Sequence, residues 1–329
     1  MSISMTAAPS SATSLGVGYE RASINAVLQQ PGVLAVIGFG GAMPIADDPR
    51  VLRIGLEPVQ AGWLEVWRGG AGAEWGSDAD LRWSTDGIHL FFAIDVVEAD
   101  HGGIVGATEH AYRRINAFVG PSATPHVLRL WNYLDAINLG DGDDERYRLF
   151  CEGRARGMRV YGETHYPAAS AIGRQDGVRI LQVYGLASRI AGVPIENPRQ
   201  TSAWRYPRRY GPVAPTFARG MLASSSQLLI SGTAAVVGHA SRHDNDLAAQ
   251  VEETLANLES LLTQAGVAEA ELGADSCLKI YLRDPSCADF VIDALGRHAP
   301  TLPEPLVLAG DICRAELLVE IDGMHGVAR

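Results

Sequence analysis

The sequence predicts an α+β fold built from two similar units, each a mixed β-sheet with helices packed on one face. Three observations lead to this fold class. The chain has 329 residues, a length that suits one large domain or two ordinary ones. Hydrophobic residues make up 47% of the chain and charged residues 20%, as in ordinary globular proteins. A strand–helix–strand pattern then occurs twice, which favours an ancient duplication.

The first half begins with a Ser/Ala/Thr-rich stretch, residues 1–20, which we expect to be disordered. Apolar runs at Val33–Phe39 and Trp63–Trp67 predict strands, and a Gly-rich hairpin or surface connection ending at Gly76 follows. The first copy of the repeat comes next, as a strand at His89–Glu98, a helix from about Ile104 to Phe118 and a strand at His126–Leu134.

The second copy has the same order of parts. Its helix is well defined, because Leu247, Val251, Leu255 and Leu258 recur at the spacing of one helix face, and Gly266 ends it as a C-cap. Strands flank this helix, a second helix follows, and a strand closes the chain. The expected ranges of these elements are Gln227–His239, Leu278–Asp284, Cys287–His298 and Ala315–Met324.

The predicted boundary between the two units lies near residues 145–162, beside the acidic turn GDGDDE. Acidic residues next to glycines are typical of an exposed connection. We therefore divide the chain into a disordered N-terminus (1–20), an N-terminal unit (21–150) and a C-terminal, catalytic unit (151–329).

The charge balance excludes two classes of partner. With 27 basic and 38 acidic side chains, the formal charge is −11, which argues against nucleic acid and against anionic membrane surfaces. The sequence shows neither a membrane span nor a secretory signal, and the four cysteines lack zinc or disulfide spacing. We expect a soluble, cytoplasmic protein that acts on a small molecule. The sequence leaves open whether it forms a homo-oligomer.

Two short motifs resemble cofactor or metal sites, and neither fits. GFGGAMP at Gly38–Pro44 lacks the third glycine of a dinucleotide loop and places Pro44 inside the helix that should follow. His239 and His243 are four residues apart, but they precede the predicted helix and lack the H-E-x-x-H pattern. We therefore expect no cofactor and no metal.

The segment Asn197–Arg219 is unusual in an acidic chain. It holds five arginines, four prolines, three aromatic residues that carry a hydroxyl or an indole group (Trp204, Tyr206 and Tyr210), and no acid. Arginine binds carboxylates in a bidentate way and tyrosine adds a phenolic donor, so the segment predicts a clamp for a small acid. The alternative is an exposed basic loop, or a patch that pairs with acids elsewhere in the fold.

Two further clusters are less specific on their own. In YRLFCEGR, Tyr147 and Arg154 are seven residues apart, which is about two helical turns. In the last strand, Glu316, Glu320 and Asp322 alternate with apolar residues, so we expect these acids mostly to face solvent. As a catalytic acid, Glu320 would have to point into a pocket, where burial raises the pKa of its carboxyl group.

Together these segments resemble the chorismatases, enzymes that remove pyruvate from chorismate. The resemblance covers nearly the whole chain and implies two RidA/YjgF-like (chorismate-mutase-like) units, chorismate as substrate and no cofactor. It agrees with the duplication inferred from the repeat. Its five ordered motifs are WNYLDAIN (131–138), YRLFCEGR (147–154), RYPRRYGPVAPTFARG (205–220), ISGTAAVVGHASRH (230–243) and CRAELLVEIDG (313–323).

The resemblance implies roles for individual residues. Glu320 matches the essential acid/base glutamate of the family. Chorismate has two carboxylates, and the family holds each with a clamp of arginine and tyrosine. The matching residues are Tyr147 with Arg154 for one carboxylate, and Tyr206 and Tyr210 with Arg219 for the other.

Cys313 and Ala235 bear on the product. A cysteine seven residues before the glutamate resembles the members that form 3-hydroxybenzoate, or both 3- and 4-hydroxybenzoate, and Cys313 occupies that position. The residue after SGTA, here Ala235, varies with the product in this family. Because seven is an odd spacing, Cys313 and Glu320 can both touch substrate only if the strand bulges or breaks near Arg314.

We therefore expect a chorismatase that forms 3-hydroxybenzoate and 4-hydroxybenzoate plus pyruvate, with Glu320 protonating the enol ether. Three alternatives stay open: hydrolysis to a dihydroxycyclohexadiene carboxylate plus pyruvate, a RidA-like imine deaminase, and a non-catalytic protein that binds small acids. Release of pyruvate from chorismate separates the chorismatases from the last two.

Overall fold

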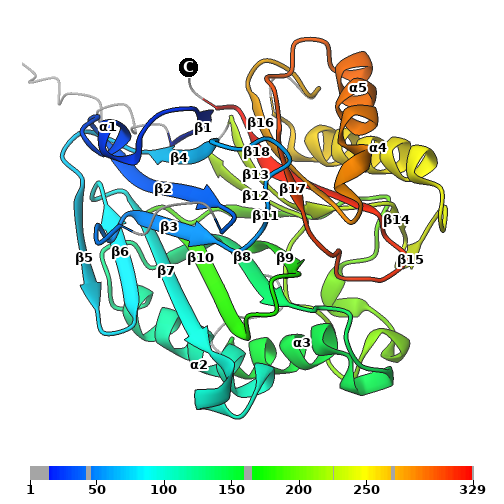
Figure 1. Cartoon of the computed structure of the whole chain (residues 1–329), viewed down its shortest axis with the longest axis horizontal. Helices are drawn as coiled ribbons and strands as arrows, with labels where there is room; N and C mark the ends of the chain where they lie inside the picture. Colours follow the sequence, from blue (N-terminus) through cyan, green and yellow to red (C-terminus); the bar gives the residue numbers. More distant parts are fainter. Residues whose placement is uncertain (1–14, 42–45, 159–164, 225, 268–270, 328–329) are drawn as a thin grey trace, which may run out of the picture.

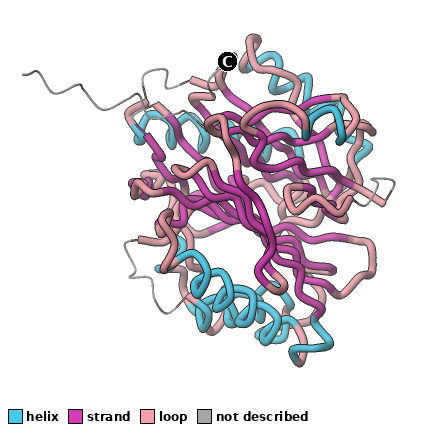
Figure 2. Tube along the Cα trace, turned by 90° about the vertical axis from the view of Figure 1, so that its left-hand side faces the viewer, coloured by secondary structure: helices cyan, strands magenta, loops and turns pink. Residues whose placement is uncertain are grey.

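The computed structural model describes residues 15–41, 46–158, 165–224, 226–267 and 271–327. Its architecture is α+β, which confirms the predicted fold class. The sheets occupy the middle of the molecule, and the long helices lie on its outer faces (Figure 1, Figure 2).

The first large sheet contains six strands in the order β5-β6-β7-β10-β8-β9. All neighbouring pairs are antiparallel except β8 with β9, which is parallel. The strands are β5 (Glu74–Asp78), β6 (Leu81–Thr85), β7 (His89–Val97), β8 (His126–Asp135), β9 (Ala168–Arg174) and β10 (Ile180–Ser188).

The second large sheet repeats this arrangement, with the order β11-β12-β13-β18-β16-β17 and one parallel pair, β16 with β17. If the strands of each sheet are numbered along the chain, both sheets have the same order, so the predicted repeat is confirmed as a repeat of topology. The strands are β11 (Val193–Ile195), β12 (Gly220–Ser224), β13 (Gln227–Thr233), β16 (Ser276–Leu282), β17 (Leu306–Ala309) and β18 (Val319–His325).

Two helices cover the outer face of each sheet, α2 (Ile104–Val119) and α3 (Arg146–Gly157) on the first, and α4 (Leu247–Ala265) and α5 (Ala288–His298) on the second (Figure 1). Helix α4 is the predicted amphipathic helix, and its stripe is buried against the sheet. Asp246 caps its first turn, and Gly266 ends it with φ 66°, a conformation that suits glycine. None of the helices in the described ranges is long and apolar enough to cross a membrane.

The inner faces of the two sheets pack against each other, because side chains alternate along each strand. In β18, Val319 and Ile321 join the core under the helices of the second unit. In β7, Phe92 packs under the helices of the first unit, whereas Phe91 belongs to the central core between the sheets. Glu320 and Asp322, which alternate with Val319 and Ile321 along β18, therefore point toward the first unit.

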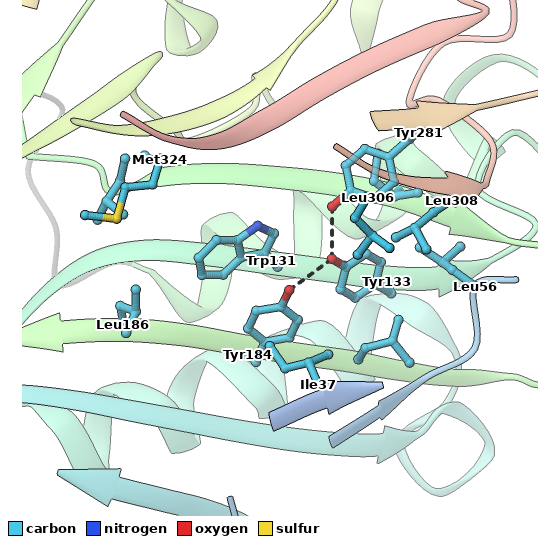
Figure 3. Packing of buried hydrophobic residues seen from close by; sticks show 14 of the residues in the cluster. Ile37, Leu56, Trp131, Tyr133, Tyr184, Leu186, Tyr281, Leu306, Leu308 and Met324 are labelled. Carbon is cyan, nitrogen blue, oxygen red and sulfur yellow. Dashed lines mark hydrogen bonds between the residues drawn. The ribbon is translucent and has the colours of Figure 1, made fainter. Parts of the chain in front are cut away.

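A third sheet of four strands completes the central core, in the order β1-β4-β2-β3. Its Ile37 packs in the same core as Trp131 and Tyr184 (Figure 3). Its strands are β1 (Gly16–Glu20), β2 (Val33–Phe39), β3 (Val51–Ile54) and β4 (Leu64–Arg68). The remaining α-helix and strands are α1 (Ile24–Leu28), β14 (Val236–Val237) and β15 (Ala240–Ser241).

Two predicted boundaries differ from the structure. Within the stretch expected to be disordered, residues 16–20 form strand β1, which pairs with β4, and residues 1–14 lie outside the described residues. The expected division after residue 150 falls inside α3, and β9 and β10 complete the first sheet beyond it, so the sheets divide between Ser188 and Val193. Both differences arise from pairing between strands that are distant in the sequence, and a local sequence pattern does not reveal such pairing.

Candidate active site

A cavity of about 500 Å³ lies where the two units meet. The connection from β8 to α3 forms one wall, and the segment Asn197–Arg219, the loop after β13 and the turn before β18 form the others. A cavity of this size can enclose a small organic molecule. Six of the predicted site residues line it: Tyr147, Tyr206, Tyr210, Arg219, Cys313 and Glu320.

Glu320 reaches this cavity from strand β18 and has only 4% of its surface exposed. The expectation that the acids of this strand mostly face solvent is wrong for Glu320 and Asp322, because the face that they share packs against the first unit. Glu316 is exposed as expected, but it precedes the strand. Gly232 on β13 makes room for the acid, since a Cβ atom there would collide with Oε1 of Glu320.

The surroundings of Glu320 keep its carboxyl group protonated. Burial raises its pKa to about 8, and the charge of Asp322 adds to the rise, whereas Arg129 and Arg219 oppose it. A carboxyl group with this pKa holds a proton at neutral pH and can give it to a bound molecule. Glu320 is therefore suited to general acid catalysis.

Arg219 and Tyr206 form one polar wall of the cavity. Nη2 of Arg219 donates to the Tyr206 hydroxyl at 2.6 Å and to the backbone oxygen of Thr201 at 2.9 Å. Its Nε is buried and has no hydrogen-bond partner among the described residues. A buried, unpaired donor on an arginine is suited to a bound anion, because burial strengthens the interaction with an opposite charge.

Arg314 provides a second cation that the sequence-based site did not include. Its guanidinium lies over the rings of Tyr210 and Tyr206, at 4.2 and 5.1 Å from their centroids. Nη1 donates to the backbone oxygen of His239 and to Ser241 Oγ, both at 3.0 Å. Its position next to Cys313, inside the motif CRAELLVEIDG, is the signal that could have identified it.

Cys313 and Tyr147 lie on the side of the cavity that faces α3. The chain turns at Arg314–Leu317 and the strand starts at Val319, so the break that the odd spacing requires is present, and both Cys313 and Glu320 reach the cavity. Burial and the nearby Glu320 raise the pKa of Cys313, and burial also raises that of Tyr147. Both groups therefore stay neutral.

Two predicted site residues do not line the cavity. Ala235 is fully buried in the central core, and its neighbours Ala234 and Val236 line the cavity instead, because successive side chains of an extended segment point in opposite directions. Arg154 is also buried, one helical turn beyond Cys151 in α3.

Arg154 contacts Tyr112 of α2 and Met158, the residue that follows α3. Its guanidinium lies 5.3 Å from the centroid of the Tyr112 ring, and its Nε donates to Met158 Sδ at 3.3 Å. Its Nη2 has no hydrogen-bond partner in the described part of the chain. The structure thus separates the predicted pair, with Tyr147 at the cavity and Arg154 behind it.

The arginines of the segment Asn197–Arg219 fall into two groups, which correspond to the two roles considered for this segment. Arg209 and Arg219 line the cavity, as a clamp requires. Arg199 bonds to Glu253 and Arg208 bonds to Asp143, as in a patch that pairs with acids elsewhere in the fold. The ion pair of Arg208 is solvent-exposed and contributes little to stability.

Comparison with known proteins is consistent across sequence and structure. The family model "Chorismatase FkbO/Hyg5-like, N-terminal" matches residues 65–187. A 3-hydroxybenzoate synthase of Streptomyces hygroscopicus is 33% identical over 290 residues, which cover 82% of this chain and 83% of that protein. A chorismatase of Streptomyces rapamycinicus is 34% identical over 277 residues, covering 80% and 82% of the two chains. A crystal structure of a chorismatase has a TM-score of 0.84 and 30% identity, and the match covers 96% of this chain and 99% of that one.

Proposed function

Since the chain belongs to the chorismatase family, we propose that it converts chorismate into 3-hydroxybenzoate and 4-hydroxybenzoate plus pyruvate, with Glu320 as the acid. The observation that carries this proposal is the buried carboxyl group of Glu320, with its raised pKa, in a cavity that four arginines and three tyrosines also line. The positive wall suits a dianionic substrate, and the neutral acid can transfer its proton.

The two carboxylates of chorismate need two cationic partners. We assign one to Arg219 with Tyr206 and the other to Arg314 with Tyr210, because these pairs line the same cavity. Each buried, charge-assisted contact contributes about 1.5–3 kcal/mol. Tyr147 stays a neutral phenol and can donate a further hydrogen bond to the substrate.

Glu320 then protonates the methylene carbon of the enol ether, which creates an oxocarbenium-like centre. The oxygen of the hydroxyl on the neighbouring ring carbon forms a bond to the ether-bearing carbon as the ether C–O bond breaks and pyruvate leaves, so this oxygen bridges the two ring carbons. One of its two C–O bonds then breaks, and the carbon that keeps the oxygen loses its proton, which the Glu320 carboxylate can accept. The hydroxyl proton stays on the oxygen, and the product is the aromatic acid. The atoms of chorismate are thereby divided between hydroxybenzoate and pyruvate, with no net oxidation or reduction.

Cys313 decides between this route and hydrolysis by keeping water from the oxocarbenium-like centre. Its thiol is not the acid or a nucleophile, because burial and the adjacent Glu320 raise its pKa. The side chain instead fills space next to the acid.

We also propose a cytoplasmic location, which is supported by four cysteines that form no disulfide.

The test is pyruvate release by purified wild type and the Glu320→Gln variant with chorismate. The variant keeps the shape of the side chain and loses the proton, so its rate should fall by about 10²-fold or more. Glu252→Gln on the exposed side of α4 is the matched control and should retain wild-type activity. Near-wild-type turnover by Glu320→Gln would remove Glu320 from the mechanism.

A further inference from the structure

A continuous chain of buried polar side chains crosses the central core and ends beside Glu320. At one end, Lys279 Nζ donates to Glu65 Oε2 at 2.6 Å and to the Tyr184 hydroxyl at 2.9 Å. The Tyr133 hydroxyl lies 3.3 Å from that of Tyr184 and 3.0 Å from that of Tyr281 (Figure 3). The chain therefore runs from the third sheet to the second unit.

At the other end is Asp322, two residues after Glu320 in β18 and on the same face of the sheet. Asp322 and Arg129 are both fully buried, with at most 1% of their surface exposed. A single oxygen of Asp322, Oδ2, accepts four hydrogen bonds. The donors are Arg129 Nη2 at 3.0 Å, Trp131 Nε1 at 3.1 Å, Ser170 Oγ at 2.6 Å and the Tyr281 hydroxyl at 3.0 Å.

The charges along this chain are balanced without Glu320. Lys279 is paired with Glu65, and Arg129 is paired with Asp322. A further negative charge on Glu320 would therefore find no free partner within this chain of side chains, which is unfavourable for a buried group. Outside the chain, Arg219 lowers the pKa of Glu320, but burial outweighs this effect.

We propose that Asp322 and Arg129 are positioning residues for the reaction: by neutralising each other they deprive Glu320 of a counter-charge, so that it holds its proton until the substrate takes it. This inference rests on the proposed role of Glu320 as the acid. It attributes the protonation state of Glu320 to the buried ion pair between Arg129 and Asp322. Arg129 belongs to the first unit and Asp322 to the second.

Other ionisable groups around Glu320 do not replace this pair. Arg219 approaches from the segment before β12, but it is bonded to Tyr206, and its backbone nitrogen contacts Glu196. Cys313, from the turn before β18, stays a neutral thiol, and Arg314 is directed to the tyrosines over which it lies. Tyr281 on β16 is a neutral phenol because its pKa is raised by burial.

The experiment measures kcat/KM for chorismate against pH, since the descending limb reports ionisation of the acid in the free enzyme. Wild type should lose activity as pH rises through about 8. In Asp322→Asn the positive charge of Arg129 is left unopposed, so the limb should move to lower pH by about one unit or more, with activity recovered in acid. In Arg129→Met the charge of Asp322 is unopposed, and the limb should move to higher pH.

Two further variants separate charge from structure. Asp322→Asn combined with Arg129→Met leaves no buried charge unpaired, so its limb should return close to that of wild type, and it keeps the test open if a single variant does not fold. Tyr281→Phe removes a hydrogen bond to Asp322 without changing charge and should leave the limb in place.

The outcomes are distinguishable. Opposite shifts in the two single variants support the inference. Shifts in the same direction, unmoved limbs, or a displaced limb in the double variant would overturn it while leaving Glu320 as the acid. Retained turnover in Glu320→Gln would instead refute the proposed function on which the inference rests.

Discussion

The proton on Glu320 should make the stability of the folded chain depend on pH, in a way that a single substitution abolishes. Burial raises the pKa of this carboxyl group from an ordinary value of 4.5 to about 8, with a contribution from Asp322. Between these two values the folded protein binds one proton that the unfolded chain releases. The contribution of Glu320 to stability is therefore fully present below pH 4.5 and is lost progressively as pH rises to about 8.

The size of the effect follows from the proton linkage. One proton bound by the folded state alone changes the free energy of unfolding by about 1.4 kcal/mol for each pH unit. From pH 5 to pH 8 the ionisation of this single group should thus lower the free energy of unfolding by about 4 kcal/mol. Glu320→Gln cannot ionise, so this part of the pH dependence should disappear in the variant.

The assay is urea denaturation of wild type and Glu320→Gln at a series of pH values from 5 to 8, with the difference in the free energy of unfolding plotted against pH. The difference should grow in favour of the variant as pH rises. Glu252→Gln, which changes an exposed carboxylate, should follow wild type throughout. Parallel curves for wild type and Glu320→Gln would show that Glu320 ionises normally in the folded protein and would refute the reasoning.

Two other predictions concern the wall of the cavity. Cys313→Ala opens space beside the acid, so products should shift from 3-hydroxybenzoate toward the non-aromatic diol or 4-hydroxybenzoate, while pyruvate release falls far less than in Glu320→Gln. Chromatography of the products decides this, and lost pyruvate release with an unchanged product ratio would contradict it. Arg219→Ala and Arg314→Ala should each lower kcat/KM by an amount equivalent to about 2–4 kcal/mol, whereas Arg208→Ala, with its exposed ion pair, should have little effect. Equal losses in all three would indicate a diffuse basic patch.

The repeated units could be predicted because their signals are local. The apolar stripe from Val251 to Leu262 and the capping residues Asp246 and Gly266 specify α4 without reference to the rest of the chain. Alternation of apolar side chains likewise indicates β18. Strand pairing is not local, so the membership of β9 and β10 in the first sheet could not be predicted from their own residues.

The site was predictable where a motif carried it and not where burial decided it. The resemblance of the motif CRAELLVEIDG to the chorismatases indicates Glu320 and Cys313, and both line the cavity. The alternation of polar and apolar residues along the same strand predicted that Asp322 faces solvent, and it is buried. A sheet face that packs against another unit shows the same two-residue alternation as a face exposed to water, so the pattern cannot distinguish them. Arg314 and the buried Arg129 are separated from their partners by long stretches of sequence, and only the fold brings them together.

Analysis of the products formed from chorismate by the purified wild-type protein tests the central claim most directly. The account predicts 3-hydroxybenzoate, accompanied by 4-hydroxybenzoate, with one pyruvate released for each aromatic molecule formed. Chorismate left intact, or pyruvate released with only the non-aromatic dihydroxycyclohexadiene carboxylate, would contradict it.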